Sequence, residues 1–135
     1  MILVDSSVLI DHFRGTSNPQ TEQFGRWLSG LDGPPDIGVA DLVVFEVVRG
    51  FATAKAQAQA RELLLALDVV EIGGLNNALQ AAALYQRLRQ QGRTVRSPID
   101  VLLASYCMTH GHVLLHRDAD FESLKGVGDL DTWPH

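Results

Sequence analysis

Short apolar runs alternate along the chain with longer segments in which apolar residues recur every three or four positions. The short runs are rich in β-branched residues and flanked by turn residues, which predicts buried strands over 2–4, 37–39, 69–72 and 113–115. The longer segments predict a helix that begins near residue 6 and others over 20–31, 41–50, 54–67, 75–91, 97–110 and 119–125. We expect one more edge strand near Leu130.

The ends and apolar stripes of these helices can also be predicted. Ser6 or Ser7 is expected to cap the first helix, which ends near Gly15. Asp41 is expected to cap the helix that ends at Gly50. One stripe on the helix over 20–31 holds Phe24, Trp27, Leu28 and Leu31. One stripe on the helix over 75–91 holds Leu75, Leu79, Ala82, Tyr85 and Leu88.

The alternation of strands and helices predicts the fold class. Strand–helix–strand units form right-handed crossovers and give a mainly parallel sheet. We therefore expect an α/β protein with a three-layer α/β/α sandwich, built as one domain over 1–135. In such sheets, binding sites form outside the carboxyl ends of the strands. Residues that directly follow a strand are thus the first candidates for function.

Composition removes several classes of protein. The chain carries 16 acidic and 11 basic residues, a formal net charge of −5, which argues against binding nucleic acid through a broad basic surface. Cys107 is the only cysteine, which excludes an intrachain disulfide and a cysteine zinc cluster. No apolar run reaches the ~18 residues of a membrane helix, and the N-terminus does not resemble a signal peptide. We expect a cytoplasmic protein with no membrane partner.

Three carboxylates stand in apolar surroundings. Asp5 closes the first strand, and Glu46 is the only polar residue within 42–48. Asp100 lies in the first turn of a mostly apolar helix. A buried carboxylate needs a cation or becomes protonated, because an unpaired charge is expensive to remove from water.

Two more acidic residues, Asp118 and Asp120, follow the strand over 113–115. Converging carboxylates repel, by about 4 kcal/mol for two charges 4 Å apart at an effective dielectric of 20. Mg²⁺ removes this repulsion, prefers oxygen ligands and keeps waters that phosphates can replace. Such a site would bind nucleic acid through metal-neutralised acid, without a basic surface.

Each carboxylate also has a purely structural interpretation. Asp5 could cap the first helix. Asp100 could complete a capping box with Ser97. Glu46 could form a salt bridge with Arg49. Asp118 and Asp120 could be solvated charges at the start of a helix.

Four segments in order resemble the motifs of the PIN-domain family, and within it those of VapC-type toxins. The segments are 2–10, 46–50, 95–104 and 114–121, so the resemblance spans nearly the whole chain. The first is an apolar run that leads into Asp-Ser-Ser, and the second is Glu-Val-Val-Arg-Gly. The third contains Arg-Ser-Pro-Ile-Asp, and the fourth places Asp-Ala-Asp-Phe after a strand.

This resemblance implies a metal-dependent endoribonuclease, the toxin of a VapBC-type toxin–antitoxin pair. It implies Mg²⁺, for which Mn²⁺ can substitute, a homodimer, and a VapB-type antitoxin in the active-site groove. The implied catalytic set is Asp5, Glu46, Asp100 and Asp118. The implied metal ligands are Asp5, Asp100 and Asp118, with Glu46 and Asp120 contributing through water. The expected reaction is hydrolysis of an RNA phosphodiester that leaves 5′-phosphate and 3′-hydroxyl ends.

Two positions depart from the family pattern, and three arginines are candidates for RNA contacts. Ser6 replaces a frequent Thr and is expected to donate to Asp118 or to a metal-bound water. His116 replaces a frequent Thr or Ser and is expected to make a surface contact or to donate to a ligand rather than bind the metal. The arginines expected to contact RNA are Arg96, Arg117 and Arg93.

Three other interpretations compete with a toxin. A receiver or haloacid-type phosphatase also uses Asp at strand ends, but receivers need a second acid near Asp5, and Asp5-Ser6-Ser7 breaks the phosphatase Asp-x-Asp pattern. A PIN-domain nuclease in RNA processing, outside a toxin–antitoxin pair, would carry the same motifs. An interaction domain with a degenerate site is opposed by the complete set of carboxylates.

Overall fold

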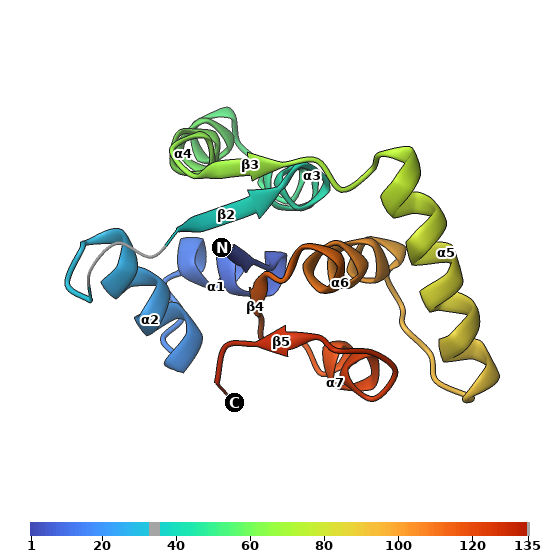
Figure 1. Cartoon of the computed structure of the whole chain (residues 1–135). Coiled ribbons are helices and arrows are strands. Elements are labelled where there is room, and N and C mark those ends of the chain that lie inside the picture. The colour runs from blue at the N-terminus through green and yellow to red at the C-terminus, as the bar shows by residue number, and fades with distance from the viewer. Residues whose placement is uncertain (33–35, 135) are drawn as a thin grey trace.

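The computed structural model describes residues 1–32 and 36–134. Within them lie five strands: β1 (Ile2–Val4), β2 (Ile37–Ala40), β3 (Asp68–Val70), β4 (Val113–Leu115) and β5 (Asp131–Thr132). The helices of the described chain are α1 (Ser6–Arg14), α2 (Pro19–Leu28), α3 (Asp41–Arg49), α4 (Ala54–Leu65), α5 (Leu75–Gln90), α6 (Pro98–His110) and α7 (Asp120–Lys125). The elements follow the predicted order, including the edge strand beside Leu130 (Figure 1).

The strands form one sheet in the order β3-β2-β1-β4-β5, and every pairing is parallel. The mainly parallel sheet predicted from the sequence is therefore confirmed. The chain first builds the sheet from β1 to β3 and then returns to place β4 on the other side of β1. The strand order therefore reverses between β1 and β4, and sheets of this type bind ligands beside the carboxyl ends of the strands at such a reversal.

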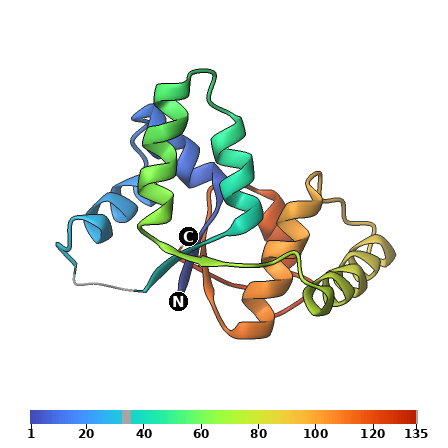
Figure 2. The same cartoon turned by 90° about the horizontal axis from the view of Figure 1, so that it is seen from above.

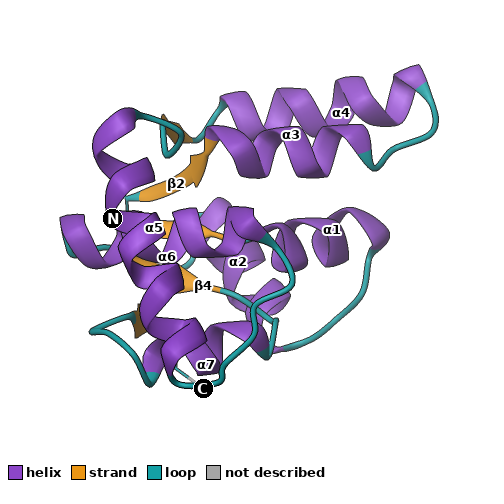
Figure 3. Cartoon of the chain, turned by 90° about the vertical axis from the view of Figure 1, so that its right-hand side faces the viewer, coloured by secondary structure: helices purple, strands orange, loops and turns teal. Residues whose placement is uncertain are grey.

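Helices cover both faces of the sheet, as the three-layer prediction requires. Right-handed crossovers put α1 to α4 on one face and the helices that follow β3 on the other. Figure 2 shows α3 and α4 on one side of the strands, with α5 and α6 on the opposite side. The helix α7 packs against α6. In Figure 3, α3 and α4 run side by side and project away from the sheet.

The core lies between these layers and draws on residues from Leu3 to Leu130. Cys107 is buried in it as a free thiol. None of the helices in the described chain combines the length and apolar character needed to cross a bilayer.

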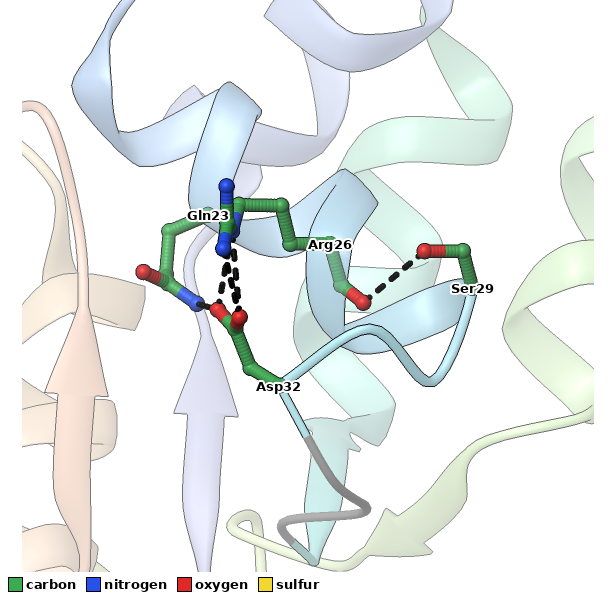
Figure 4. Close-up of polar contacts among 4 residues, drawn as sticks. All are labelled: Gln23, Arg26, Ser29 and Asp32. Carbon is green, nitrogen blue, oxygen red and sulfur yellow. Dashed lines mark hydrogen bonds and ion pairs between the residues drawn. The ribbon is translucent and has the colours of Figure 1, made fainter.

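The end of α2 differs from its prediction. Asn18 and Thr21 form a capping box at its start, and the helix ends at Leu28 instead of residue 31. Leu31 is 74% exposed, so it does not extend the apolar stripe. The turn after the helix is closed by Asp32, which accepts hydrogen bonds from Arg26 and Gln23 (Figure 4). These bonds lower the pKa of Asp32 to about 2, with that from Arg26 the larger cause.

Two further predictions about helices are wrong. Asp41 does not cap α3, because Ala40 holds the cap position and the Asp41 carboxylate accepts from the backbone of Leu42 and of Ile72. That carboxylate therefore ties the start of α3 to the segment after β3. On α5, the first part of the predicted stripe faces outward: Leu75 is 74% exposed and Leu79 is 63% exposed, whereas Leu88 of the same stripe is buried as predicted. The face turned to the core holds Ala81, Leu84 and Leu88.

Candidate functional site

Asp5 follows β1 and is held by hydrogen bonds of both its backbone and its side chain. Its backbone N–H donates to the Leu115 carbonyl at 2.9 Å, which continues the pairing of β1 with β4. Its Oδ2 accepts from the Ser7 N–H at 3.1 Å and from the Ser7 hydroxyl at 2.6 Å, so Asp5, not either serine, caps α1. Its Oδ1 is buried without a hydrogen-bond partner among the described residues. The cap occupies one carboxylate oxygen and leaves the other for a ligand.

Asp100 lies in the first turn of α6 and is almost fully buried. Ser97 holds the cap position but its side chain makes no capping bond, so the capping box considered for Asp100 is not completed. Burial raises the pKa of Asp100 to about 8, and repulsion from Asp5, Asp118, Glu46 and Asp120 adds to the rise. The structural interpretation of this residue therefore fails, and a cluster of carboxylates surrounds it.

Asp118 and Asp120 follow β4 and face Asp100. Carboxylate oxygens of these three residues lie within 4.8 Å of one another. Asp118 Oδ1 also accepts from the Asp120 N–H at 3.0 Å, which fixes the turn into α7. Asp120, which was expected to contribute through water, offers an oxygen to this group. Asp5 lies outside the group and is still near enough for Asp118 to raise its pKa, after the larger effect of burial.

Glu46 reaches the same region from α3. Its Oε1 is buried and has no hydrogen-bond partner within the described chain. Burial, and then Asp5, raise the pKa of Glu46, whereas Arg49 lowers it. No ion pair joins Glu46 to Arg49 among the described residues, and the Arg49 guanidinium lies 5.1 Å from the centre of the Phe45 ring. The salt-bridge interpretation of Glu46 therefore has no support.

The hydroxyls next to Asp5 have different roles from those expected. Ser6 was expected to donate to Asp118 or to a metal-bound water; in this structure its side chain donates to Glu46 and lowers the pKa of that carboxyl. Ser7, considered only as a helix cap, donates to Asp5 and accepts from the Arg117 N–H at 3.0 Å. The sequence offered one signal for Ser7, because a capping Asp accepts from residues in the first turn of its helix.

His116 follows β4 directly and is buried, not at the surface. Its Nδ1 accepts from the Asp118 N–H at 3.2 Å, so this nitrogen acts as an acceptor where a donor was expected. The ring lies 4.8 Å from that of Phe121, measured between centres. His116 therefore supports the turn that carries Asp118.

The three candidate arginines lie in different settings. Arg96 is exposed, and its Nε lies 3.5 Å from Asp120 Oδ2. The Arg117 guanidinium donates to Gln20 Oε1 on α2 at 2.9 Å. Arg93 donates to the Ser123 carbonyl at 3.0 Å and lies against Gly126. Arg96 and Arg117 border the carboxylates, whereas the contacts of Arg93 tie it to α7.

These residues fit a hard divalent cation. All the converging donors are carboxylate oxygens, which Mg²⁺ and Mn²⁺ prefer. Two of the oxygens, Asp5 Oδ1 and Glu46 Oε1, are buried without a hydrogen-bond partner in the described chain, which is costly unless a ligand satisfies them. The raised pKa of Asp100 indicates that the site lacks sufficient positive charge of its own.

Comparison with known proteins agrees with this arrangement. The ribonuclease VapC11 of Mycobacterium tuberculosis and the VapC ribonuclease Mb1587 of Mycobacterium bovis are each 28% identical to this chain over 132 residues, which cover 98% of it and 97% of theirs. The VapBC2 structure of Rickettsia felis, bound to a promoter DNA fragment, matches with a TM-score of 0.75 at 14% identity, over 99% of this chain and 100% of that one.

A second solved structure, DNA-bound VapBC of Salmonella typhimurium, has a TM-score of 0.75 at 16% identity and covers 98% of both chains. At such identities the two structures establish likeness of fold. The sequence model of the PIN domain matches residues 2–127. The chain therefore belongs to the PIN domain family, as its four motifs predicted.

Proposed function

We propose that this protein is a metal-dependent endoribonuclease and the toxin of a VapBC-type toxin–antitoxin pair. One observation carries the proposal. Carboxylates from the ends of β1 and β4 and from α3 converge on Asp100 of α6; burial, and then repulsion from these carboxylates, raises its pKa to about 8. Like charges held this close together destabilise the folded chain unless a cation neutralises them. The relatives that match over nearly the full chain are named ribonucleases.

The proposed cation is Mg²⁺, with Mn²⁺ as a substitute. Asp5, Asp100 and Asp118 would hold it, and Glu46 and Asp120 would contribute through water. When bound, the ion would polarise a water and a phosphodiester oxygen and stabilise the leaving oxygen. The products would carry 5′-phosphate and 3′-hydroxyl ends.

The chain's own groups would position the other reactants. Glu46 Oε1, which is buried and has no partner in the described chain, can accept a proton from the attacking water and orient it. Ser6 keeps that carboxyl in place by its hydrogen bond. Arg96 and Arg117 border the carboxylates and would bind phosphates of the RNA on either side of the scissile bond. Arg93 would contribute only if it left the Ser123 carbonyl.

The proposed protein partner is a VapB-type antitoxin. Several solved structures with this fold are VapBC assemblies, including VapBC-1 of Haemophilus influenzae. The projecting helices α3 and α4 offer it a surface: a hollow of about 360 Å³ lined by Val44, Phe45, Val48, Arg49, Gln57 and Arg61. We propose that the antitoxin covers part of this pair and reaches the carboxylates.

A homodimer is proposed from the outward face of α5. Leu75, Leu79 and Tyr85 are exposed there, beside an apolar hollow of about 290 Å³ between α5 and α6. Exposed apolar patches of this kind mark protein interfaces. We further propose that 1–135 forms one domain that works in the cytoplasm. The continuous core from Leu3 to Leu130 supports the single domain.

Expression of the protein and of Asp100→Asn in cells, followed by mapping of RNA ends, tests the nuclease. We expect new 5′-phosphate ends and growth arrest with the parent protein, and neither with the variant. Co-expression of the antitoxin should suppress both effects. Equal RNA ends from the two proteins would overturn the proposal. Cleavage without growth arrest would favour a PIN nuclease outside a toxin–antitoxin pair.

A further inference from the structure

The Ser7 hydroxyl makes two hydrogen bonds that join distant parts of the sequence. It donates to Asp5 Oδ2 at 2.6 Å and accepts from the backbone N–H of Arg117 at 3.0 Å. Ser7 and Arg117 are 110 positions apart. The hydroxyl therefore bridges the two chain segments that follow the carboxyl ends of β1 and β4.

This bridge lies just beyond the last regular contacts between the two strands. Val4 is the register partner of Leu115, and the Asp5 N–H donates to the Leu115 carbonyl at 2.9 Å. After these residues the chains diverge, β1 into α1 and β4 toward α7. The Ser7 hydroxyl supplies a side-chain contact where the backbone ladder has ended. It thus fixes the distance between the segments that carry Asp5 and Asp118.

The same hydroxyl also fixes the rotation of the Asp5 carboxylate. Oδ2 takes the Ser7 N–H and the Ser7 O–H, and a 2.6 Å contact is typical of a strong bond to an ionised carboxylate. The other oxygen, Oδ1, is buried and unpartnered among the described residues. With Oδ2 held by Ser7, only Oδ1 remains to bind a cation.

We infer that Ser7 is a positioning residue for the cation site. Its hydroxyl orients Asp5 Oδ1 and holds the Asp118 segment beside it, so both ligands are in place before a cation arrives. This inference rests on the proposed function, because it concerns the same site. Groups that orient metal ligands typically change metal affinity by 10- to 100-fold when they are removed.

The test compares three substitutions at Ser7 with one elsewhere. Ser7→Ala removes the hydroxyl, and Ser7→Thr keeps it. Ser7→Cys keeps the approximate size with a poor donor, and serves if the alanine variant does not fold. The matched control is Ser17→Ala, which removes a hydroxyl that donates to Glu22 at 2.8 Å at the start of α2. Binding of Mn²⁺ is measured by electron paramagnetic resonance of the free ion, and folding by thermal unfolding without metal.

We expect Ser7→Ala and Ser7→Cys to bind Mn²⁺ about 10- to 100-fold more weakly than the parent protein. Ser7→Thr and Ser17→Ala should stay within about threefold of the parent, since their site hydroxyl remains. Parent-like Mn²⁺ affinity in a folded Ser7→Ala or Ser7→Cys protein would overturn the inference. An equal loss in Ser7→Thr would also overturn it, because the hydroxyl would not be the cause. A parent protein that binds Mn²⁺ but cleaves no RNA would instead refute the proposed function alone.

Discussion

A carboxylate oxygen of Asp100, at the start of α6, lies within 4.8 Å of one from Asp118, which follows β4. These two residues sit on separate elements, and Asp120 joins them in one group of converging carboxylates. Their repulsion adds to the effect of burial on the pKa of Asp100. The protein without metal therefore carries an electrostatic penalty that its solution behaviour should reveal.

The first prediction concerns the stability of the metal-free protein against pH. Burial raises the pKa of Asp100 from 3.8 to about 8, so the folded state binds this proton more tightly than the unfolded chain. Stability is then lost as the pH rises toward 8. Burial lowers the pKa of His12 and of His112 from 6.5. These two groups make the stability rise with pH, but only below pH 6.5.

The midpoint of thermal unfolding should therefore fall between about pH 6.5 and pH 8 in the presence of EDTA. In Asp100→Asn the decline should be much weaker, and at pH 8 this variant should be more stable than the parent by roughly 1–3 kcal/mol. A parent midpoint that stays constant over this interval would contradict the proximity of the carboxylates.

Addition of Mg²⁺ or Mn²⁺ should stabilise the parent protein. A ligand that binds only the folded state raises its stability by about 2.7 kcal/mol at 100 times its dissociation constant. Differential scanning calorimetry across a metal titration measures this shift. Asp118→Asn should lose most of it, and an equal ionic strength of KCl provides the control. A shift as large in Asp118→Asn as in the parent would remove Asp118 from the ligands.

Substitution of His116 should distinguish the roles of its two ring nitrogens. Asn places an oxygen near the position of Nδ1 and can still accept from the Asp118 N–H, whereas Gln reaches toward the position of Nε2. An unpaired buried N–H costs about 1–3 kcal/mol, so His116→Gln should be less stable than His116→Asn by that amount. Urea denaturation measures the difference. Because Gln fills the space better than Asn, the reverse order would show that packing against Phe121 matters more than the hydrogen bond.

The outward face of α5 predicts the oligomeric state. Leu79→Glu places a charge in the proposed dimer contact and should yield a monomer by size-exclusion chromatography with light scattering, where the parent gives a dimer. The substitution should change monomer stability by no more than about 0.5 kcal/mol, since Leu79 is 63% exposed. Leu65→Glu, at a leucine on α4 that is 66% exposed, is the control and should remain dimeric. If all three proteins were dimers, the dimer contact would not lie on this face of α5.

The fold was largely predictable because its signals are local. Short β-branched runs and the residues that end helices are read from neighbours in sequence, so the order of elements and the parallel sheet were correct. The orientation of α5 was not predictable in this way. That helix carries one apolar stripe with Leu75 and Leu79 and another with Ala81 and Leu84, and packing against α6 decides which one is buried.

The site residues, too, could be predicted only where their signal is local in the sequence. Asp5 and Asp118 could be selected because they lie just after the ends of strands, and Glu46 because it interrupts an apolar helix. Whether Asp100 capped its helix or faced other acids depended on side-chain directions that only the folded chain determines. The second hydrogen bond of Ser7 was hidden for a similar reason, since its partner Arg117 is 110 positions away.

The reversal of strand order between β1 and β4 also has a consequence for biosynthesis. Asp5 leaves the ribosome early, but Asp100 lies on α6 and Asp118 follows β4, so β4 can pair with β1 only once α6 has been synthesised. Contacts between such distant segments form late in folding. A growing chain therefore lacks Asp118 throughout most of translation, and the proposed cation site is complete only after β4 has docked beside β1.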